Sequence, residues 1–475
     1  MHRTFLTIVC LTSFGQLAPA QGAPSSVPVA TIIPSVVCGA DSKQSYALYL
    51  PSSFSSARRW PIIYVFDPSA RGQVAVEAIQ PAAEKFGYIV AASNNSRNGP
   101  MGGSSQAMKA IWQDTQQRFP IEDQRRYVAG MSGGARVAAS IALSCRGCVA
   151  GVIANAAGFP FGAEPTRNMK FAYYAAVGNA DLNYGEFVDL RPRLDAAGSR
   201  YRIRIFDGQH GWAPPEVWIE ALNWMDMQAM SAGTMPRDPS RIQQTVVGAL
   251  AKAHEFQSQN DLLAAFREYQ SLVRDFRGLT DVSSAETSLA ELAKNKAVKT
   301  AEKEEASALE QQARMTARLS AQMQALATSD RYKIDVADLR GSLADLRKRA
   351  ADSRNSNQLK ALVLRRALGQ LVVEAMESGQ RSLEEENYSA AAVYFDLVAA
   401  GSANPAWAHY QRARAYAMLA DRKNMLAELK LSLAGGFHEN SALEAAEFQP
   451  FQGQAEFQAL VAEWKLAAKK EKAER

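Results

Sequence analysis

The feature that most constrains the fold is a strand, a sharp turn and a helix in immediate succession. Residues 127–129 form a short apolar run, and residues 130–134 read GMSGG before an alanine-rich helical pattern begins. Glycines beside a serine let a strand and a helix pass closely, because glycine has no Cβ. Glycine also tolerates the strained backbone of a sharp turn. This pattern is typical of a G-x-S-x-G elbow, which would expose Ser132 at the edge of a sheet.

The region around this turn alternates between strand-like and helix-like runs. Residues 61–66 (PIIYVF) are continuously apolar, as strands buried on both faces of a parallel sheet are. The other predicted strands cover residues 44–50, 88–92, 126–129, 149–155, 170–177 and 201–206, and the predicted helices cover 77–86, 105–119, 186–197 and 216–230. This alternation predicts an α/β fold over residues 41–233, with a mostly parallel sheet and helices on both faces.

Beyond residue 233 the sequence favours helices alone. Residues 234–241 contain prolines and polar residues, which predicts a linker before an all-α domain over residues 242–475. Ala391 to Met425 and Phe395 to Leu429 each span 34 residues, a period that resembles tetratricopeptide repeats of paired helices. The charged, alanine-rich stretch 285–350 fits either long repeat helices or a coiled-coil-like arm.

The N-terminus has the pattern of a secretory signal over residues 1–20. A weakly basic start is followed by a mostly apolar segment and by the small-residue site Ala18-Pro19-Ala20. Residues 21–40, rich in Pro, Ser, Ala and Val, are expected to be a leader. No later stretch approaches the roughly 18 uninterrupted apolar residues of a spanning helix. We therefore expect an exported protein, periplasmic or extracellular, without a transmembrane segment.

Charge and cysteine content exclude several classes of partner. The net charge of +5 is spread thinly over 475 residues, which argues against nucleic-acid binding. Behind the signal lie Cys38, Cys145 and Cys148, of which one pair can form a disulfide in an oxidising compartment. That bridge joins either Cys145 with Cys148 or one of them with Cys38. No second cysteine pair or histidine cluster is present, so we expect no metal site and no cofactor.

A serine nucleophile needs a general base, and the base needs an orienting acid. His210 is the only histidine in residues 21–236, and it lies just past the last predicted strand. Asp181 follows the strand 170–177 directly, which gives the chain order Ser, Asp, His of hydrolases with this elbow. Glu186 and Asp207 are the rival acids. We favour Asp181 because Glu186 begins the next helix and Asp207 stands only three residues before His210.

A reaction at Ser132 would also need two N–H donors for the developing oxyanion. Gly133, the residue after the serine, is the first candidate. The second should come from the loop after residues 61–66, where Pro68 has no N–H to give. Ser69 is therefore the expected second donor, with Ala70 as the alternative.

Four further residues are candidates for substrate binding. Asn94, Asn95 and Arg97 follow the predicted strand 88–92, at the sheet edge where ligands bind in open α/β folds. The same loop fits an Asx turn held by its own backbone bonds equally well. Trp212, beside His210, fits either a wall of the acyl pocket or packing against the closing helix.

Four motifs together carry a resemblance to a known family. They are PIIYVFDPSARG (61–72), GMSGGARVA (130–138), GNADLNY (178–184) and DGQHGW (207–212). With them, residues 41–233 resemble the esterase branch of the α/β-hydrolases, which includes polyhydroxybutyrate depolymerase-like, feruloyl-esterase-like and dienelactone-hydrolase-like proteins. The resemblance implies a serine hydrolase that cleaves small-molecule or polymer esters, with peptide bonds as the second class. The alternative is an interaction protein whose helical repeats bind a protein partner and whose hydrolase part is a degenerate scaffold.

Overall fold

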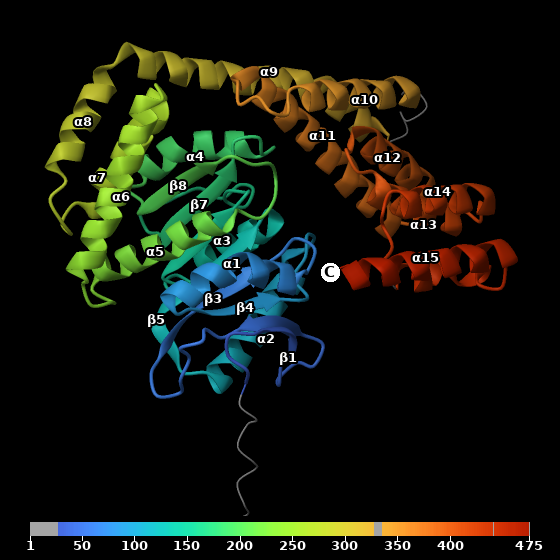
Figure 1. The fold of residues 1–475 in the computed structure, drawn as a ribbon, viewed down its shortest axis with the longest axis horizontal. Helices are drawn as coiled ribbons and strands as arrows, with labels where there is room; N and C mark the ends of the chain where they lie inside the picture. Colours follow the sequence, from blue (N-terminus) through green and yellow to red (C-terminus); the bar gives the residue numbers. More distant parts are fainter. Residues whose placement is uncertain (1–26, 327–334, 440, 475) are drawn as a thin grey trace, which may run out of the picture.

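The fold is that of a computed structural model, which describes residues 27–326, 335–439 and 441–474. The expected signal peptide, residues 1–20, lies outside the described residues. Two parts are visible in Figure 1: an α/β part around one sheet, and a set of helices that arches over it. None of the described helices is both long enough and apolar enough to cross a bilayer.

Eight strands form one sheet in the order β1-β2-β4-β3-β5-β6-β7-β8. Strand β2 runs antiparallel to its neighbours β1 and β4, and all other neighbouring pairs are parallel. The strands are β1 (Ile32–Val37), β2 (Ser45–Tyr49), β3 (Trp60–Phe66), β4 (Ile89–Ser93), β5 (Ile121–Met131), β6 (Gly151–Asn155), β7 (Ala172–Gly178) and β8 (Tyr201–Phe206). The chain changes direction across the sheet between β3 and β5, and ligands of open α/β folds bind at such a point.

Helices cover both faces of this sheet, as the strand–helix alternation predicts. One face carries α1 (Gly72–Phe86) and α5 (Pro215–Ala232). The other carries α2 (Met101–Arg118), α3 (Gly133–Ser144) and α4 (Tyr184–Ala196). Ile62 and Tyr64 of β3 enter the α2–α3 side of the core, while Ile63 enters the α1–α5 side. Because successive strand side chains point to opposite faces, a strand covered on both sides must be apolar throughout.

The N-terminal boundary of the α/β part differs from the expected one. Strand β1 lies within residues 21–40, which we expected to be a leader, and it forms the edge of the sheet. Its strand pattern is obscured in the sequence by Pro34 and Ser35, and its pairing with β2 is irregular between Ile33 and Val36. Proline is tolerated on an edge strand because only one side of that strand donates to a neighbour.

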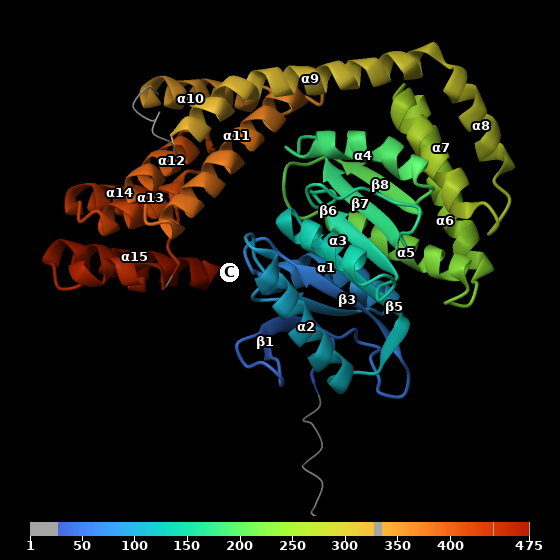
Figure 2. The same ribbon diagram turned by 180° about the vertical axis from the view of Figure 1, so that it is seen from behind.

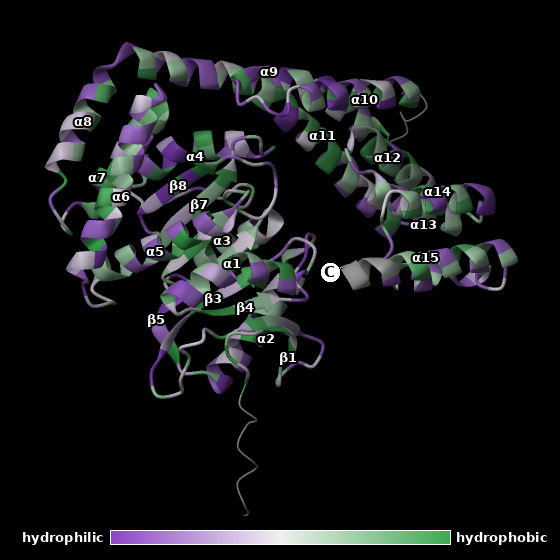
Figure 3. Cartoon of the chain, in the orientation of Figure 1, coloured by the Kyte–Doolittle hydropathy of each residue, from purple (hydrophilic) through white to green (hydrophobic). Residues whose placement is uncertain are grey.

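The remaining described elements are helical. They are α6 (Pro239–Ser258), α7 (Leu262–Phe276), α8 (Ser283–Lys294), α9 (Lys296–Ala325), α10 (Val336–Asp352), α11 (Leu359–Glu384), α12 (Tyr388–Gly401), α13 (Ala406–Met418), α14 (Arg422–Ala434), the short 3₁₀ turns Ala442–Glu444 and Ala446–Phe451, and α15 (Ala455–Glu474). Figures 1 and 2 show α6–α8 along one flank of the sheet, α9 crossing above it, and α10–α15 on the opposite flank. Hydrophilic (purple) and hydrophobic (green) segments alternate along α9 in Figure 3, as expected for a helix with one solvent-exposed face.

The 34-residue period of the sequence reappears as a repeated turn. Glu386 and Ala420 both have positive φ, and each is followed by a helix-capping residue, Asn387 or Asp421. Both capping side chains accept the N–H three residues later. The pair Asn260 and Asp261 before α7 has the same arrangement. The repeated turn agrees with a repeating helical unit, and its tetratricopeptide nature stays a prediction.

The helical part is packed onto the α/β part through buried charges. The Arg202 guanidinium of β8 contacts Glu220 of α5 and reaches across to Glu268 and Asp275 of α7. The Arg202 side chain is only 8% exposed, so its charge needs these carboxylates nearby. The linker between the two parts is short: α5 ends at Ala232, Gly233 takes the left-handed conformation, and α6 begins at Pro239.

Candidate active site

Ser132 stands at the junction of β5 and α3, at the carboxyl edge of the sheet. Its φ of 53° and ψ of −123° are strained for a residue with a side chain, as a nucleophile elbow requires. A Cβ on Gly130 would lie 2.3 Å from the carbonyl carbon of Gly134, and one on Gly134 would lie 2.0 Å from the oxygen of Phe66. The two glycines are therefore needed for the close passage of β3, β5 and α3.

Three side chains from separate loops meet at this edge. His210 Nε2 lies 3.0 Å from Ser132 Oγ, and His210 Nδ1 lies 2.9 Å from Asp181 Oδ1. Asp181 is fully buried, whereas the His210 side chain is 19% exposed. A buried carboxylate can only accept hydrogen bonds, so it holds the proton on Nδ1 and leaves Nε2 free to accept from the serine hydroxyl. This is the geometry of an activated serine.

The loops that carry Asp181 and His210 are bonded to each other. Asn179 N–H donates to Phe206 O at 2.8 Å, and Ala180 N–H donates to Gly208 O at 2.9 Å. A Cβ on Gly178 would lie 2.3 Å from Gly208 O, so glycine is required for this approach. Asp181 Oδ1 also accepts from Asn183 N–H at 2.8 Å. The backbone therefore fixes Asp181 toward His210.

The two rival acids are engaged elsewhere. Glu186 binds Arg136 at 2.5 Å and accepts from Gly158 N–H at 3.0 Å, which anchors the loop after β6. Asp207 is exposed and accepts from the Asn179 side chain at 3.1 Å. Neither carboxylate contacts His210, whereas Asp181 does.

The hydrogen bonds of the loop after β3 differ from the expectation that Ser69 or Ala70 has a free N–H for the oxyanion. Ser69 N–H donates to Asp67 Oδ1 at 2.8 Å, which closes an Asx turn, and Ala70 N–H donates to Asp67 O at 3.2 Å. Both candidate donors are thus occupied within their own loop. Buried Asp67 also binds the Arg71 guanidinium, at 3.0 and 2.9 Å. Gly133 differs, because as the first residue of α3 it has an N–H for which the helix offers no acceptor.

The expected substrate-binding residues have mixed roles. Asn94 donates to Pro34 O at 3.1 Å, and Asn95 bonds Ser45 N–H and Lys43 O, so both amides hold the β1–β2 region rather than facing the site. Arg97 is exposed and its backbone forms a bridge with Ser69. The two asparagine side chains are therefore structural, but they bond the β1–β2 region and form no Asx turn within their own loop.

Trp212 connects the histidine loop to the loop after β3. Its indole Nε1–H donates to Asp67 Oδ2 at 3.1 Å, and its ring lies 5.9 Å from the ring of Trp218 in α5. The side chain thus serves the packing against the closing helix, one of its two expected roles, and adds a hydrogen bond that the sequence does not indicate.

Residues that the sequence does not single out also approach the site. Asn98 lies over Gly133, since a Cβ there would be 1.8 Å from Asn98 Oδ1. The Asn98 amide donates to Glu377 of α11 at 3.4 Å, and Arg366 of the same helix donates to Asn179 O at 2.6 Å. These pairs are separated by 279 and 187 residues. No local pattern could have revealed them.

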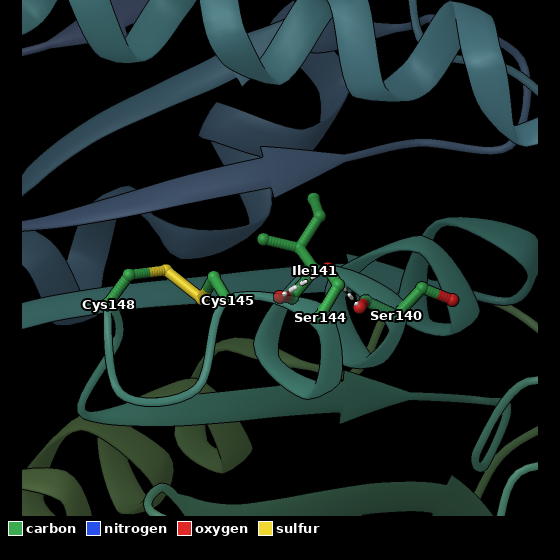
Figure 4. Close-up of a disulfide and its surroundings, with 5 residues drawn as sticks. All are labelled: Ser140, Ile141, Ser144, Cys145 and Cys148. Atoms are coloured by element: carbon green, nitrogen blue, oxygen red, sulfur yellow. Dashed lines mark hydrogen bonds between the residues drawn. A yellow bond between two sulfur atoms is a disulfide. The ribbon is translucent and has the colours of Figure 1, made fainter.

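Of the described cysteines, Cys145 and Cys148 are bonded to each other and Cys38 remains a free, buried thiol. Figure 4 shows the bridge beyond the end of α3, where Ser144 Oγ donates back to Ser140 O and Ile141 O. Burial is the main cause that raises the pKa of Cys38, to about 11, which keeps this thiol neutral. Within the described part of the chain, no group of three or more His, Cys, Asp or Glu side chains is arranged to hold a metal.

Comparison with protein-family models and with curated proteins found no match. Among solved structures, the chain is similar to S-formylglutathione hydrolase of Staphylococcus aureus, at 14% identity and a TM-score of 0.32 over 38% of this chain and 90% of that one. A ferulic acid esterase matches at 17% identity and 0.32, over 40% and 93%. An esterase of Pyrobaculum calidifontis matches at 11% identity and 0.36, over 43% and 87%. These similarities concern the fold of the matched part alone.

Proposed function

We propose that this chain is an exported serine hydrolase that cleaves carboxylic esters, in small molecules or polymers, through an acyl-enzyme on Ser132. The observation that carries the proposal is the pair of contacts from His210, 3.0 Å to Ser132 Oγ and 2.9 Å to Asp181 Oδ1. The disulfide between Cys145 and Cys148 supports export, because such bonds persist in oxidising compartments.

In the proposed reaction, Ser132 Oγ attacks the ester carbonyl carbon while His210 Nε2 takes its proton. Asp181 stabilises the imidazolium that forms. The oxyanion of the tetrahedral intermediate accepts from the Gly133 N–H, where the N-terminus of α3 adds a partial positive charge. His210 then protonates the departing alcohol oxygen. Water repeats the sequence on the acyl-enzyme, which releases the acid and restores Ser132.

The test is turnover of p-nitrophenyl esters by full-length variants. We expect Ser132→Ala and His210→Ala to lower kcat by at least about 10⁴-fold, because nucleophile and base act as one unit. Ser140→Ala is the matched control, since Ser140 lies on α3 and its Oγ donates to Arg136 O rather than to the site. Unchanged turnover in a folded Ser132→Ala variant would contradict the proposal.

A second candidate function is a binding scaffold without catalysis, with the helical part contacting a protein partner. It is favoured by one observation, the occupation of the Ser69 and Ala70 N–H groups by Asp67. Labelling with a fluorophosphonate separates the two functions. An active serine is labelled in the wild type and not in Ser132→Ala, whereas a scaffold stays unlabelled in both.

A further inference from the structure

Helix α11 of the helical part contacts the loop that carries Asp181. Arg366 Nε donates to the carbonyl oxygen of Asn179 at 2.6 Å, two residues before Asp181. Three residues further along α11, Gly369 faces Leu182, since a Cβ on this glycine would lie 3.7 Å from the Leu182 Cβ. Residues three apart lie on the same face of a helix. One face of α11 therefore lies along the loop both before Asp181, at Asn179, and after it, at Leu182.

The guanidinium of Arg366 is held in one plane. It stacks on the ring of Tyr184 at 3.5 Å, and the residue is 1% exposed. Tyr184 in turn donates its hydroxyl to Glu305 of α9 at 2.5 Å. A guanidinium offers donors in a fixed planar fork, so stacking and hydrogen bonding together set the position of its partner. Asn179 and Tyr184, on either side of Asp181, are thereby tied to α11 and α9.

Charge adds to this geometry. Asp181 Oδ1 contacts His210, while Asp181 Oδ2 is buried without a hydrogen-bond partner among the residues the structure describes. Burial lowers the pKa of Arg366, and its interactions with Tyr184, with Glu305 and, to a smaller extent, with Asp181 oppose that shift.

We propose that Arg366 is a positioning residue for Asp181, so that α11 completes the active site of the α/β part from within the same chain. The inference rests on the proposed serine hydrolase function. Arg366 acts through the Asn179–Tyr184 loop and not on substrate. Its loss should therefore slow the chemical step without weakening substrate binding.

The experiment is a double-mutant cycle in the full chain, with Arg366→Gln and Asp181→Asn separately and together. Turnover of a p-nitrophenyl ester is measured per active site, with the site concentration set by fluorophosphonate titration. We expect Arg366→Gln to lower kcat about 10- to 100-fold with KM unchanged, as displacement of a catalytic group does. In the Asp181→Asn background the same replacement should change kcat less than about twofold, because its route of action is already removed.

Two variants complete the design. Arg365→Gln is the matched control, since this neighbour on α11 bonds Arg354 O and Ser356 O within the helical part. It should leave kcat unchanged. Arg366→Lys keeps the charge without the planar fork, and it replaces Arg366→Gln in the cycle if the latter does not fold.

Three outcomes would decide against the inference. Arg366 would have a structural role alone if Arg366→Gln lowered kcat equally in the wild-type and Asp181→Asn backgrounds. The same would follow if Arg366→Gln lowered only the concentration of titratable active sites and left the turnover per site unchanged. It would also follow if Arg365→Gln lowered kcat as much as Arg366→Gln does. Failure of the proposed function is recognised separately, because wild-type protein would then show no turnover that depends on Ser132.

Discussion

The indole Nε1–H of Trp212 donates to Oδ2 of Asp67 at 3.1 Å, across 145 residues of sequence. This bond ties the loop of His210 to the loop after β3, on the two sides of Ser132. Asp67 is 1% exposed, and its other oxygen accepts the Ser69 N–H. One buried carboxylate therefore organises the loop beside Ser132 and holds the His210 loop against it.

Replacing Trp212 with phenylalanine should loosen that connection. The variant removes a hydrogen bond to a buried charge, so we expect the free energy of unfolding to fall by about 1.5–3 kcal/mol and kcat/KM to fall several-fold. Trp218→Phe is the matched control, because the Trp218 Nε1–H has no hydrogen-bond partner in the described part of the chain. Urea unfolding and ester turnover measure both effects. Equal losses of kcat/KM in the two variants would contradict the role of the bond.

Gly133→Ala should lower turnover through Asn98. The added Cβ would lie 1.8 Å from Asn98 Oδ1, so either the Asn98 loop or the start of α3 must move. We expect kcat to fall about 10- to 100-fold, since the Gly133 N–H would be displaced from the oxyanion. Removing the obstacle in Gly133→Ala/Asn98→Ala should restore most of the rate. A double variant as slow as Gly133→Ala would show that the collision is not the cause.

Stability should depend on pH through Glu305, which joins α9 to α4 and α7. Burial raises its pKa, but the hydrogen bonds and charge of Arg267 outweigh burial and leave the pKa below its ordinary value of 4.5. A lowered pKa means that the folded protein binds fewer protons than the unfolded chain. Its stabilisation is therefore present above about pH 4.5 and is lost as the pH falls through the folded-state pKa.

The corresponding variant is Glu305→Gln, with the exposed neighbour Glu304→Gln as its control. At pH 7 we expect the free energy of unfolding to fall by about 3 kcal/mol, the lower end of the range for a buried pair, because the half-buried Arg267 loses its carboxylate partner. At acidic pH the difference from wild type should shrink, since Glu305 is then protonated in both states. Denaturant unfolding at several pH values measures this. A difference independent of pH would refute the assignment.

The disulfide should contribute to stability and not to catalysis. Cys145 and Cys148 are three residues apart, so the bridge closes a very short loop and removes little entropy from the unfolded chain. We expect Cys145→Ser/Cys148→Ser to lower the free energy of unfolding by about 2 kcal/mol and to leave kcat unchanged. Dithiothreitol should have the same effect on wild type and none on the double variant. A fall in kcat would point instead to a catalytic role for the pair.

Local sequence patterns predicted most strands of the α/β part, including the edge strand β8, but missed the other edge strand, β1. Strand β3 was recognisable because both of its faces are covered, which leaves a continuous apolar run. Strand β1 was missed because an edge strand with Pro34 need not alternate. The strand containing Arg126–Ala129 begins earlier than predicted, at Ile121, where polar residues interrupt the apolar pattern.

The candidate site was likewise predicted only in part. Ser132, Asp181 and His210 each stand after a strand, in the chain order that the sequence analysis used to group them, and their side chains meet in the structure. The hydrogen bonds of Ser69, Asn94 and Asn95 were not predictable, because they depend on which partner each group meets in the folded chain. The sequence alone does not distinguish a side-chain amide or a backbone N–H that faces substrate from one that bonds a neighbouring turn.

By itself, the sequence determined the order of strands and helices from residue 44 to residue 230, the sharp turn at Ser132 and the helical character of the second part. These depend on residue periodicity and turn chemistry, which act over a few residues. Only the tertiary structure decided that α11 reaches the Asp181 loop, that Asp67 occupies the Ser69 N–H, and that Cys145 pairs with Cys148. Arg366 and Asn179 lie 187 residues apart, and their contact exists only because both parts pack against each other.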